Sequence, residues 1–164
     1  MTMAAAVAFS ARAAVRQPSP TVRCDEIILR VAGKEGAADK RRLLLGRVLV
    51  PEPYLAQIER TYRQPWRYFR KAGMVIRGGL KAPVSVRVPR LWRSRVAIRW
   101  GNAGAPVSSL RFEPCAAFGA NKWNAYSGGF YLQSPSACVP LIFRVGRHSA
   151  SARFGLGVRC APTP

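Results

Sequence analysis

Residues 115–160, bounded by cysteines, constrain the fold of this chain more than any other stretch. They contain three of the four cysteines, a Gly-Gly pair at 128–129 and two runs in which apolar and polar residues alternate. Side chains of a β-strand point to opposite faces in turn, so such alternation predicts strands that bury one face. The stretch therefore predicts β-structure stapled by disulfides.

The end of this stretch predicts a β-hairpin. Residues 141–145 alternate, residues 146–148 supply a short connection, and residues 149–160 alternate again. We expect the apolar face of the last run to lie in the core: Ala150, Ala152, Phe154, Leu156 and Val158.

Further apolar or alternating runs lie upstream, and Gly, Pro or Asn residues follow most of them. They occupy residues 27–31, 42–50, 74–77, 83–88, 95–100, 109–113 and 130–133. About eight or nine short strands at this spacing predict an all-β fold, an antiparallel β-sandwich that is Ig-like or a small barrel. Residues 52–62 differ, because their apolar positions recur every three or four residues. They fit one or two turns of amphipathic helix, or an irregular loop.

A length of 164 residues with 49% hydrophobic residues fits one globular domain, which we place at 21–161. Residues 1–20 resemble a weak export signal or linker: the apolar run at 3–9 is short, but Ala-Arg-Ala at 11–13 resembles a cleavage site. Residues 162–164 form a tail. The chain lacks the roughly 18–20 consecutive apolar residues of a membrane-spanning helix.

The four cysteines predict two disulfides. The chain has no CxxC pair and a single histidine, His148, so neither a metal site nor a cofactor is expected. Cys24 precedes the first predicted strand and Cys160 ends the last. Of the three possible connectivities we therefore expect Cys24–Cys160 with Cys115–Cys138. The alternative is four free thiols in the cytosol. Disulfides need an oxidising compartment, which predicts an extracellular or envelope-associated protein.

The net charge of +20 limits the partner classes. Beyond residue 60 the only acidic residue is Glu113, whereas arginine and lysine continue along the chain. The partners to consider are nucleic acid, anionic envelope polymers and anionic lipid surfaces. A GC-rich genome would produce the same excess of arginine over lysine without selection for phosphate binding.

Two groups of residues are candidate binding sites. The first comprises arginines opposite the apolar faces of the predicted strands, which form a cationic face if those strands share a sheet: Arg87, Arg95, Arg99, Arg111, Arg144 and Arg153. An ordinary solvated sheet face is the alternative.

The second group lies in residues 60–71, where cations alternate with aromatic residues as in surfaces that pair phosphates and stack bases or sugars. Its members are Arg63, Trp66, Arg67, Tyr68, Arg70 and Lys71. In the alternative interpretation, Trp66 and Phe69 belong to the core and the cations reach past them to solvent.

Three segments carry a resemblance to a known group of proteins: VPRLWRSRVAIRWGN at 88–102, KWNAYSGGFYLQSPSACVPLIFRVG at 122–146 and RFGLGVRC at 153–160. They resemble small exported actinobacterial proteins of unknown function, which share a W-N-A-Y-x-G-G-F segment, a C-V-P-L run and a terminal G-x-G-x-x-C. Residues 46–57 and 62–79 are similar to the preceding part of the same group. The resemblance implies export and a cysteine-stapled β domain, and it implies no activity.

Catalysis is not expected. Glycoside hydrolysis by paired carboxylates needs two acids, and the strand-rich half offers Glu113 alone. A Ser-His-Asp triad would need His148, which lies in a predicted loop beside Ser149 with no carboxylate near it in sequence. We predict an exported, non-catalytic β-sandwich that binds an anionic envelope polymer, a lipid surface or an envelope protein. The alternatives are a nucleic-acid-binding module that uses residues 60–71 and a hydrolase centred on His148.

Overall fold

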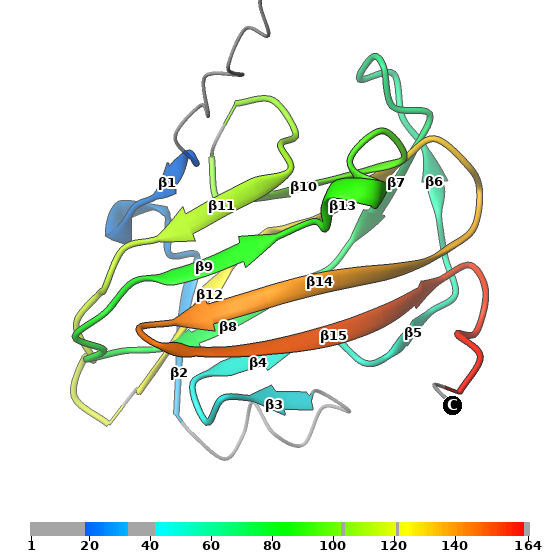
Figure 1. Ribbon diagram of the computed structural model, residues 1–164. Helices are drawn as coiled ribbons and strands as arrows, with labels where there is room; N and C mark the ends of the chain where they lie inside the picture. The colour runs from blue at the N-terminus through cyan, green and yellow to red at the C-terminus, as the bar shows by residue number, and fades with distance from the viewer. Residues whose placement is uncertain (1–18, 33–41, 103, 121, 163–164) are drawn as a thin grey trace, which may run out of the picture.

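The computed structural model describes residues 19–32, 42–102, 104–120 and 122–162. These residues form fifteen short strands and two 3-10 helices, η1 (Cys24–Glu26) and η3 (Arg90–Trp92), and the strands pair into three sheets. Figure 1 shows the sheets as two layers, with the β14–β15 hairpin in front. The predicted all-β fold with two disulfides is confirmed. Each described sheet ends in edge strands, as expected for a sandwich.

One layer is a six-stranded sheet. Its outermost pairs, β1–β11 and β15–β5, are parallel, and the pairs between them are antiparallel. Its strands, in spatial order, are β1 (Thr21–Val22), β11 (Ser109–Phe112), β9 (Val84–Arg87), β14 (Ala137–Val145), β15 (His148–Leu156) and β5 (Tyr54–Leu55).

The other layer contains two smaller sheets. The four-stranded sheet has the order β10 (Val96–Trp100), β13 (Gly128–Leu132), β7 (Tyr68–Lys71) and β6 (Glu59–Arg60). The five-stranded sheet has the order β2 (Leu29–Val31), β12 (Trp123–Tyr126), β8 (Met74–Arg77), β4 (Val48–Val50) and β3 (Arg42–Leu44). Only Ser127 separates β12 from β13, and only residues 72–73 separate β7 from β8. The chain therefore passes directly between the two small sheets at two places.

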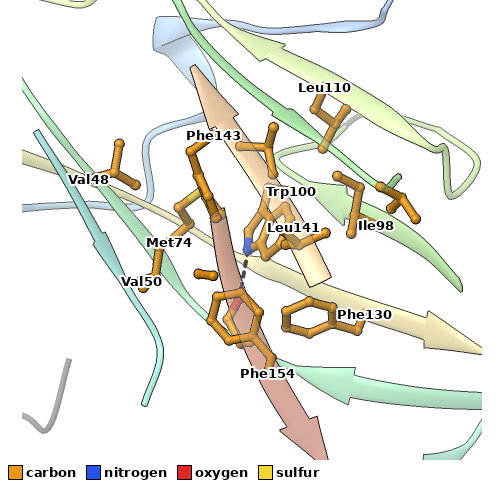
Figure 2. Close-up of a cluster of buried hydrophobic side chains, with 14 of the residues drawn as sticks. Val48, Val50, Met74, Ile98, Trp100, Leu110, Phe130, Leu141, Phe143 and Phe154 are labelled. Carbon is orange, nitrogen blue, oxygen red and sulfur yellow. Dashed lines mark hydrogen bonds between the residues drawn. The ribbon is translucent and has the colours of Figure 1, made fainter. Parts of the chain in front are cut away.

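The core lies between the two layers because strands of both bury alternate residues. Phe143 and Phe154 come from the six-stranded sheet, and they pack in one cluster with Met74 and Phe130 from the smaller sheets (Figure 2). The Trp100 indole N–H donates to the Ala72 carbonyl oxygen at 2.7 Å, so this buried ring keeps its polar atom paired. Burial of apolar area from both layers is therefore what holds them together.

The predicted hairpin is confirmed as β14–β15, in which Val145 is paired with His148. Its inner face includes Ala152, Phe154 and Leu156, all buried. The prediction for Val158 is wrong, since this side chain is 42% exposed. The strand ends at Leu156 because Gly157, with φ of 66°, turns the chain.

Two upstream segments differ from their predictions. Residues 42–50 form a hairpin, β3–β4, instead of one strand, since the chain reverses at 45–47, where Leu45 has φ of 53°. Residues 52–62 form no helix, so that interpretation is wrong. The alternative of an irregular loop is closer, because only the two-residue strands β5 and β6 interrupt it. A helix of two turns is marginal by itself, whereas β5 gains a parallel pairing with β15.

The disulfides are Cys24–Cys115 and Cys138–Cys160, so the predicted connectivity is wrong. Pairing of β1 with β11 places Val22 beside Phe112, which brings the cysteines that follow them together. Cys138 is paired with Gly155 in the β14–β15 hairpin, and the turn at Gly157 brings Cys160 back beside it. The Cα–Cα distances are 5.5 and 5.3 Å.

The described residues contain no helix that is long and apolar enough to cross a membrane. Of the predicted segment at 1–20, only Ser19 and Pro20 are described, and Pro162 is the described residue of the predicted tail.

Candidate anion-binding surfaces

The structure divides the six predicted arginines between the two layers. Four of them belong to strands of the six-stranded sheet: Arg87, Arg111, Arg144 and Arg153. Arg99 lies on β10 of the four-stranded sheet, and Arg95 immediately precedes it. The prediction that all six arginines share a single face is therefore wrong. Alternation assigns a side chain to one face of its strand, but long-range pairing decides which sheet the strand joins.

The four arginines of the six-stranded sheet share its outer face with serines, and we call this surface the arginine–serine face. Ser85 on β9 is paired with Arg111 on one side and with Arg144 on the other. Arg87 lies two residues beyond Ser85, diagonal to both neighbours, at roughly 7–8 Å between such positions. Three arginines thus flank one serine. The other members are Arg153, Ser109, Ser149 and Ser151.

The arginine–serine face has no acidic counterpart within its strands, because none of the six contains an aspartate or glutamate. The Arg87 and Arg111 side chains make no hydrogen bond or ion pair with described residues. Arg144 donates one N–H to the Gly146 carbonyl oxygen at 2.9 Å, and Arg153 donates one to the Ala161 carbonyl oxygen at 3.3 Å. The charge of this face is therefore not neutralised by its own sheet.

Three of the few acidic residues are instead used at the corner where β1 ends. Glu113 accepts the backbone N–H of Cys24 at 2.6 Å. Glu26 accepts the backbone N–H of Arg23 at 3.0 Å and also that of Asn102. Asp25 pairs with the Arg23 side chain at 3.4 Å. Glu113 and Glu26 therefore hold distant segments together at the edge of the sandwich, whereas the Asp25 ion pair is local.

Close to the same corner, Tyr126 lies buried, with its hydroxyl 3.4 Å from the Cys115 sulfur. Burial, followed by the negative charges of Glu113 and Glu26, raises the pKa of Tyr126 to about 12. Cys24, Glu113 and Cys115 bring ligand-type atoms within 4.8 Å of one another. Both sulfurs are joined in a disulfide, so they cannot supply the thiolates that a metal needs.

The outer face of the four-stranded sheet carries a small aromatic cluster, and we call it the tryptophan-capped face. Trp66 is 8% exposed and packs with Ala97, Tyr131 and Phe69; the Phe69 and Tyr131 ring centroids lie 4.8 Å apart. The Gln133 side chain donates to the Pro65 carbonyl oxygen at 2.9 Å, which fixes the loop that carries Trp66. The alternative interpretation of residues 60–71, in which these aromatic rings are packed, is therefore the correct one for Trp66.

The remaining members of the second predicted group, in residues 60–71, point in different directions. Arg63, Arg67 and Lys71 are exposed. Tyr68 packs against the main core, and Arg70 is paired with Phe130, a core residue. The segment thus does not form one continuous stacking surface.

A cavity of about 500 Å³ adjoins Arg70. Glu52, Tyr54 and Gln57, from β5 and its flanks, line it together with Arg70 of β7 and Arg159 of the C-terminal segment. The Arg159 guanidinium lies 4.5 Å from the centre of the Tyr54 ring. No motif in the sequence indicates this site. The sequence offers one local indication of it: Arg70 lies two residues after Tyr68 on the same strand, so both side chains point towards the core.

His148 lies at the start of β15, exposed, and makes no side-chain hydrogen bond or ion pair with described residues. The hydrolase alternative therefore gains no geometric support from its surroundings.

Comparison with known proteins finds no matching family model, no matching curated protein and no matching solved structure. The resemblance to exported actinobacterial proteins stays a prediction.

Proposed function

We propose that this chain is an exported, non-catalytic β-sandwich protein that binds an anionic polymer of the cell envelope through its arginine–serine face. The observation that carries the proposal is the row Arg111–Ser85–Arg144, with Arg87 beside it, on a sheet whose strands contain no carboxylate. Guanidinium groups bind phosphate or carboxylate oxygens with two parallel hydrogen bonds, and serine hydroxyls add donors between them.

The geometry of the face fits a polymer better than a single small anion. Neighbouring strands lie about 4.8 Å apart, so Arg111 and Arg144, two strands apart, are separated by roughly 10 Å. Arg153 extends the cationic surface along β15. A chain with regularly repeated charges can contact several of these residues at once, and the effective concentration of each further contact raises the overall affinity.

Export is supported by the two disulfides, since such bonds persist mainly in oxidising compartments. Nucleic-acid binding through residues 60–71 receives less support, because Trp66 is packed and Phe69 contacts Tyr131 within the protein. Bases would have few aromatic faces to stack on there.

The test is co-sedimentation of the full chain with bacterial cell walls, before and after chemical removal of their anionic polymer. At low salt we expect retention that depends on the polymer and falls as salt rises. The triple variant Arg87→Glu/Arg111→Glu/Arg144→Glu should lower retention at least tenfold. The matched control, Arg63→Glu/Arg67→Glu/Lys71→Glu, makes the same charge change on exposed residues of the other layer.

Equal loss in both triple variants would mean that net charge, and not the arginine–serine face, determines retention. Retention on walls stripped of their polymer would also contradict the proposal. Anionic lipid vesicles in a parallel assay distinguish a membrane surface from a polymer. Preferential binding to vesicles would assign the face to lipid.

A further inference from the structure

Arg70 occupies a core-facing position on β7. The strand alternates, with Phe69 in the outer aromatic cluster and Tyr68 packed against the main core, so Arg70 lies on the same side as Tyr68. Its partner across the ladder is Phe130, which is completely buried. An apolar residue is the ordinary occupant of such a position in a sandwich.

The Arg70 guanidinium has no partner in the described part of the chain. Its Nε atom is buried and has no hydrogen-bond acceptor, and no carboxylate lies within 4 Å of the group to form an ion pair. A buried charged donor without an acceptor destabilises the folded state, because water no longer solvates it. The arginine therefore lowers stability where it stands, as expected of a binding residue and not of a structural one.

The cavity beside Arg70 adds further polar groups. Arg159 is held over Tyr54 by the disulfide of the adjacent Cys160 with Cys138. Glu52 and Gln57 lie on the same cavity wall. Among the described residues Arg23 and Asp25 form an ion pair, whereas Glu52 forms none with either arginine of the cavity. The site thus presents two cations, one carboxylate, one amide and one phenol to a cavity whose volume is ordinary for a small-molecule site.

We propose that this cavity binds an acidic sugar, a hexuronic acid unit with one negative charge. Arg70 and Arg159 would pair with its carboxylate, and their formal charge together with that of Glu52 is +1, which matches a monoanion. Glu52 and Gln57 offer oxygen acceptors, which need hydroxyl donors from the ligand. A phosphate or sulfate ion supplies few or none of these, whereas a sugar acid supplies several.

This cavity lies apart from the arginine–serine face, since no residue that flanks Ser85 lines it. The inference therefore does not rest on the function proposed above. A failure of sugar binding leaves wall retention as it was, and a failure of wall retention leaves the cavity to be tested separately.

The test is a titration of the full, oxidised chain with sodium D-glucuronate, followed by amide chemical shifts, with D-glucose and inorganic phosphate as comparison probes. We expect saturable shifts at residues 52–57, 70 and 159 with glucuronate, and weaker or absent shifts with the other two. Arg159→Gln and Arg70→Met should each weaken glucuronate binding about tenfold or more, as expected for loss of a charged hydrogen bond. Arg147→Gln, an equal charge change at an exposed turn, should leave it unchanged.

Arg70→Met also separates a binding role from a structural one. Arg70 is half-buried, with its Nε atom buried and unpaired. Its replacement by an apolar side chain of similar length should leave the melting temperature unchanged or raise it. If Arg70→Met melts at a lower temperature, Arg159→Gln still tests sugar binding, because Arg159 is exposed and its replacement should not disturb the fold. Equal binding of glucose, phosphate binding as tight as that of glucuronate, or unchanged affinity in Arg159→Gln would each overturn the proposal.

Discussion

Each outer face of the sandwich carries a short row with a small residue between two cations, but the two rows have different structural roles. On the six-stranded sheet, Ser85 lies between Arg111 and Arg144. On the four-stranded sheet, Gly129 lies between Arg99 and Lys71. Both rows place a small residue between two cations on neighbouring strands, so composition alone does not distinguish them.

The two rows differ in their surroundings. A side chain at Gly129 would collide with the Arg70 carbonyl oxygen, so the backbones there approach too closely for any other residue. Trp66 and its aromatic partners cover the sheet two residues away. No such cluster packs on the arginine–serine face among the described residues. The tryptophan-capped face is therefore part of the packing of the fold, whereas the described residues leave the arginine–serine face uncovered.

The largest expected effect comes from Trp66→Ala, which removes the ring that covers Ala97 and Tyr131. We expect unfolding in urea to show a loss of about 3–5 kcal/mol, as for other buried aromatic residues. Tyr62→Ala is the control, since Tyr62 is 97% exposed and should change stability by less than about 0.5 kcal/mol. Similar small losses in both variants would mean that the tryptophan-capped face is not packed.

A smaller effect should follow from exchange of the central residues of the two rows for alanine. Gly129→Ala forces a backbone shift and should destabilise by about 1–3 kcal/mol, as overpacking does. Ser85→Ala should lie within about 0.5 kcal/mol of the parent, because its surroundings are open. Thermal melting of the two variants side by side measures the difference. Equal melting temperatures would remove the distinction between the rows.

As pH rises above neutral, the folded state should lose stability before the arginines lose their charge. Because the pKa of Tyr126 is raised to about 12, the unfolded chain ionises this phenol near pH 10 while the folded chain keeps it protonated. The stability that Tyr126 contributes to the folded state is therefore fully present below pH 10 and is lost as pH rises towards 12. Urea unfolding at pH 8 to 11 should show this decline, and Tyr126→Phe should reduce it. A decline of the same size in Tyr126→Phe would assign it to other groups.

The smallest effect on stability should come from Arg111→Gln/Arg144→Gln. Loss of two exposed cations that flank Ser85 should change the free energy of unfolding by less than about 0.5 kcal/mol. The same variant should lower the slope of wall retention against the logarithm of salt concentration, because fewer counterions are displaced. A clear loss of stability would show that this face, like the other, belongs to the packing.

Local pattern was sufficient to predict the strands whose faces differ in polarity. Leu141, Phe143 and Phe154 alternate with polar or exposed neighbours, and the hairpin that contains them is found as expected. Local pattern was insufficient to predict which sheet a strand joins, because pairing between distant segments decides this. Arg99 and Arg111 look equivalent in sequence, but β10 pairs with β13 and β11 pairs with β9.

The disulfides and the cavity illustrate the same limit. Cys24 meets Cys115 because β1 pairs in parallel with β11, and the paired residues Val22 and Phe112 lie far apart in the sequence. No local pattern encodes such a separation. Arg159 lines the same cavity as Arg70 because the chain turns at Gly157 and a disulfide holds the segment. Each of these contacts depends on the complete topology.

The two disulfides also determine how this domain would respond to tension applied at its ends. Force that enters before Cys24 passes through the bond to Cys115, and force that leaves after Cys160 passes through the bond from Cys138. Both covalent loops are therefore shielded from stretching. The segment between Cys115 and Cys138, which holds β12 and β13, is the part that can lengthen, to a full extension of about 80 Å at most. An oxidised domain would thus act as a short tether of limited reach.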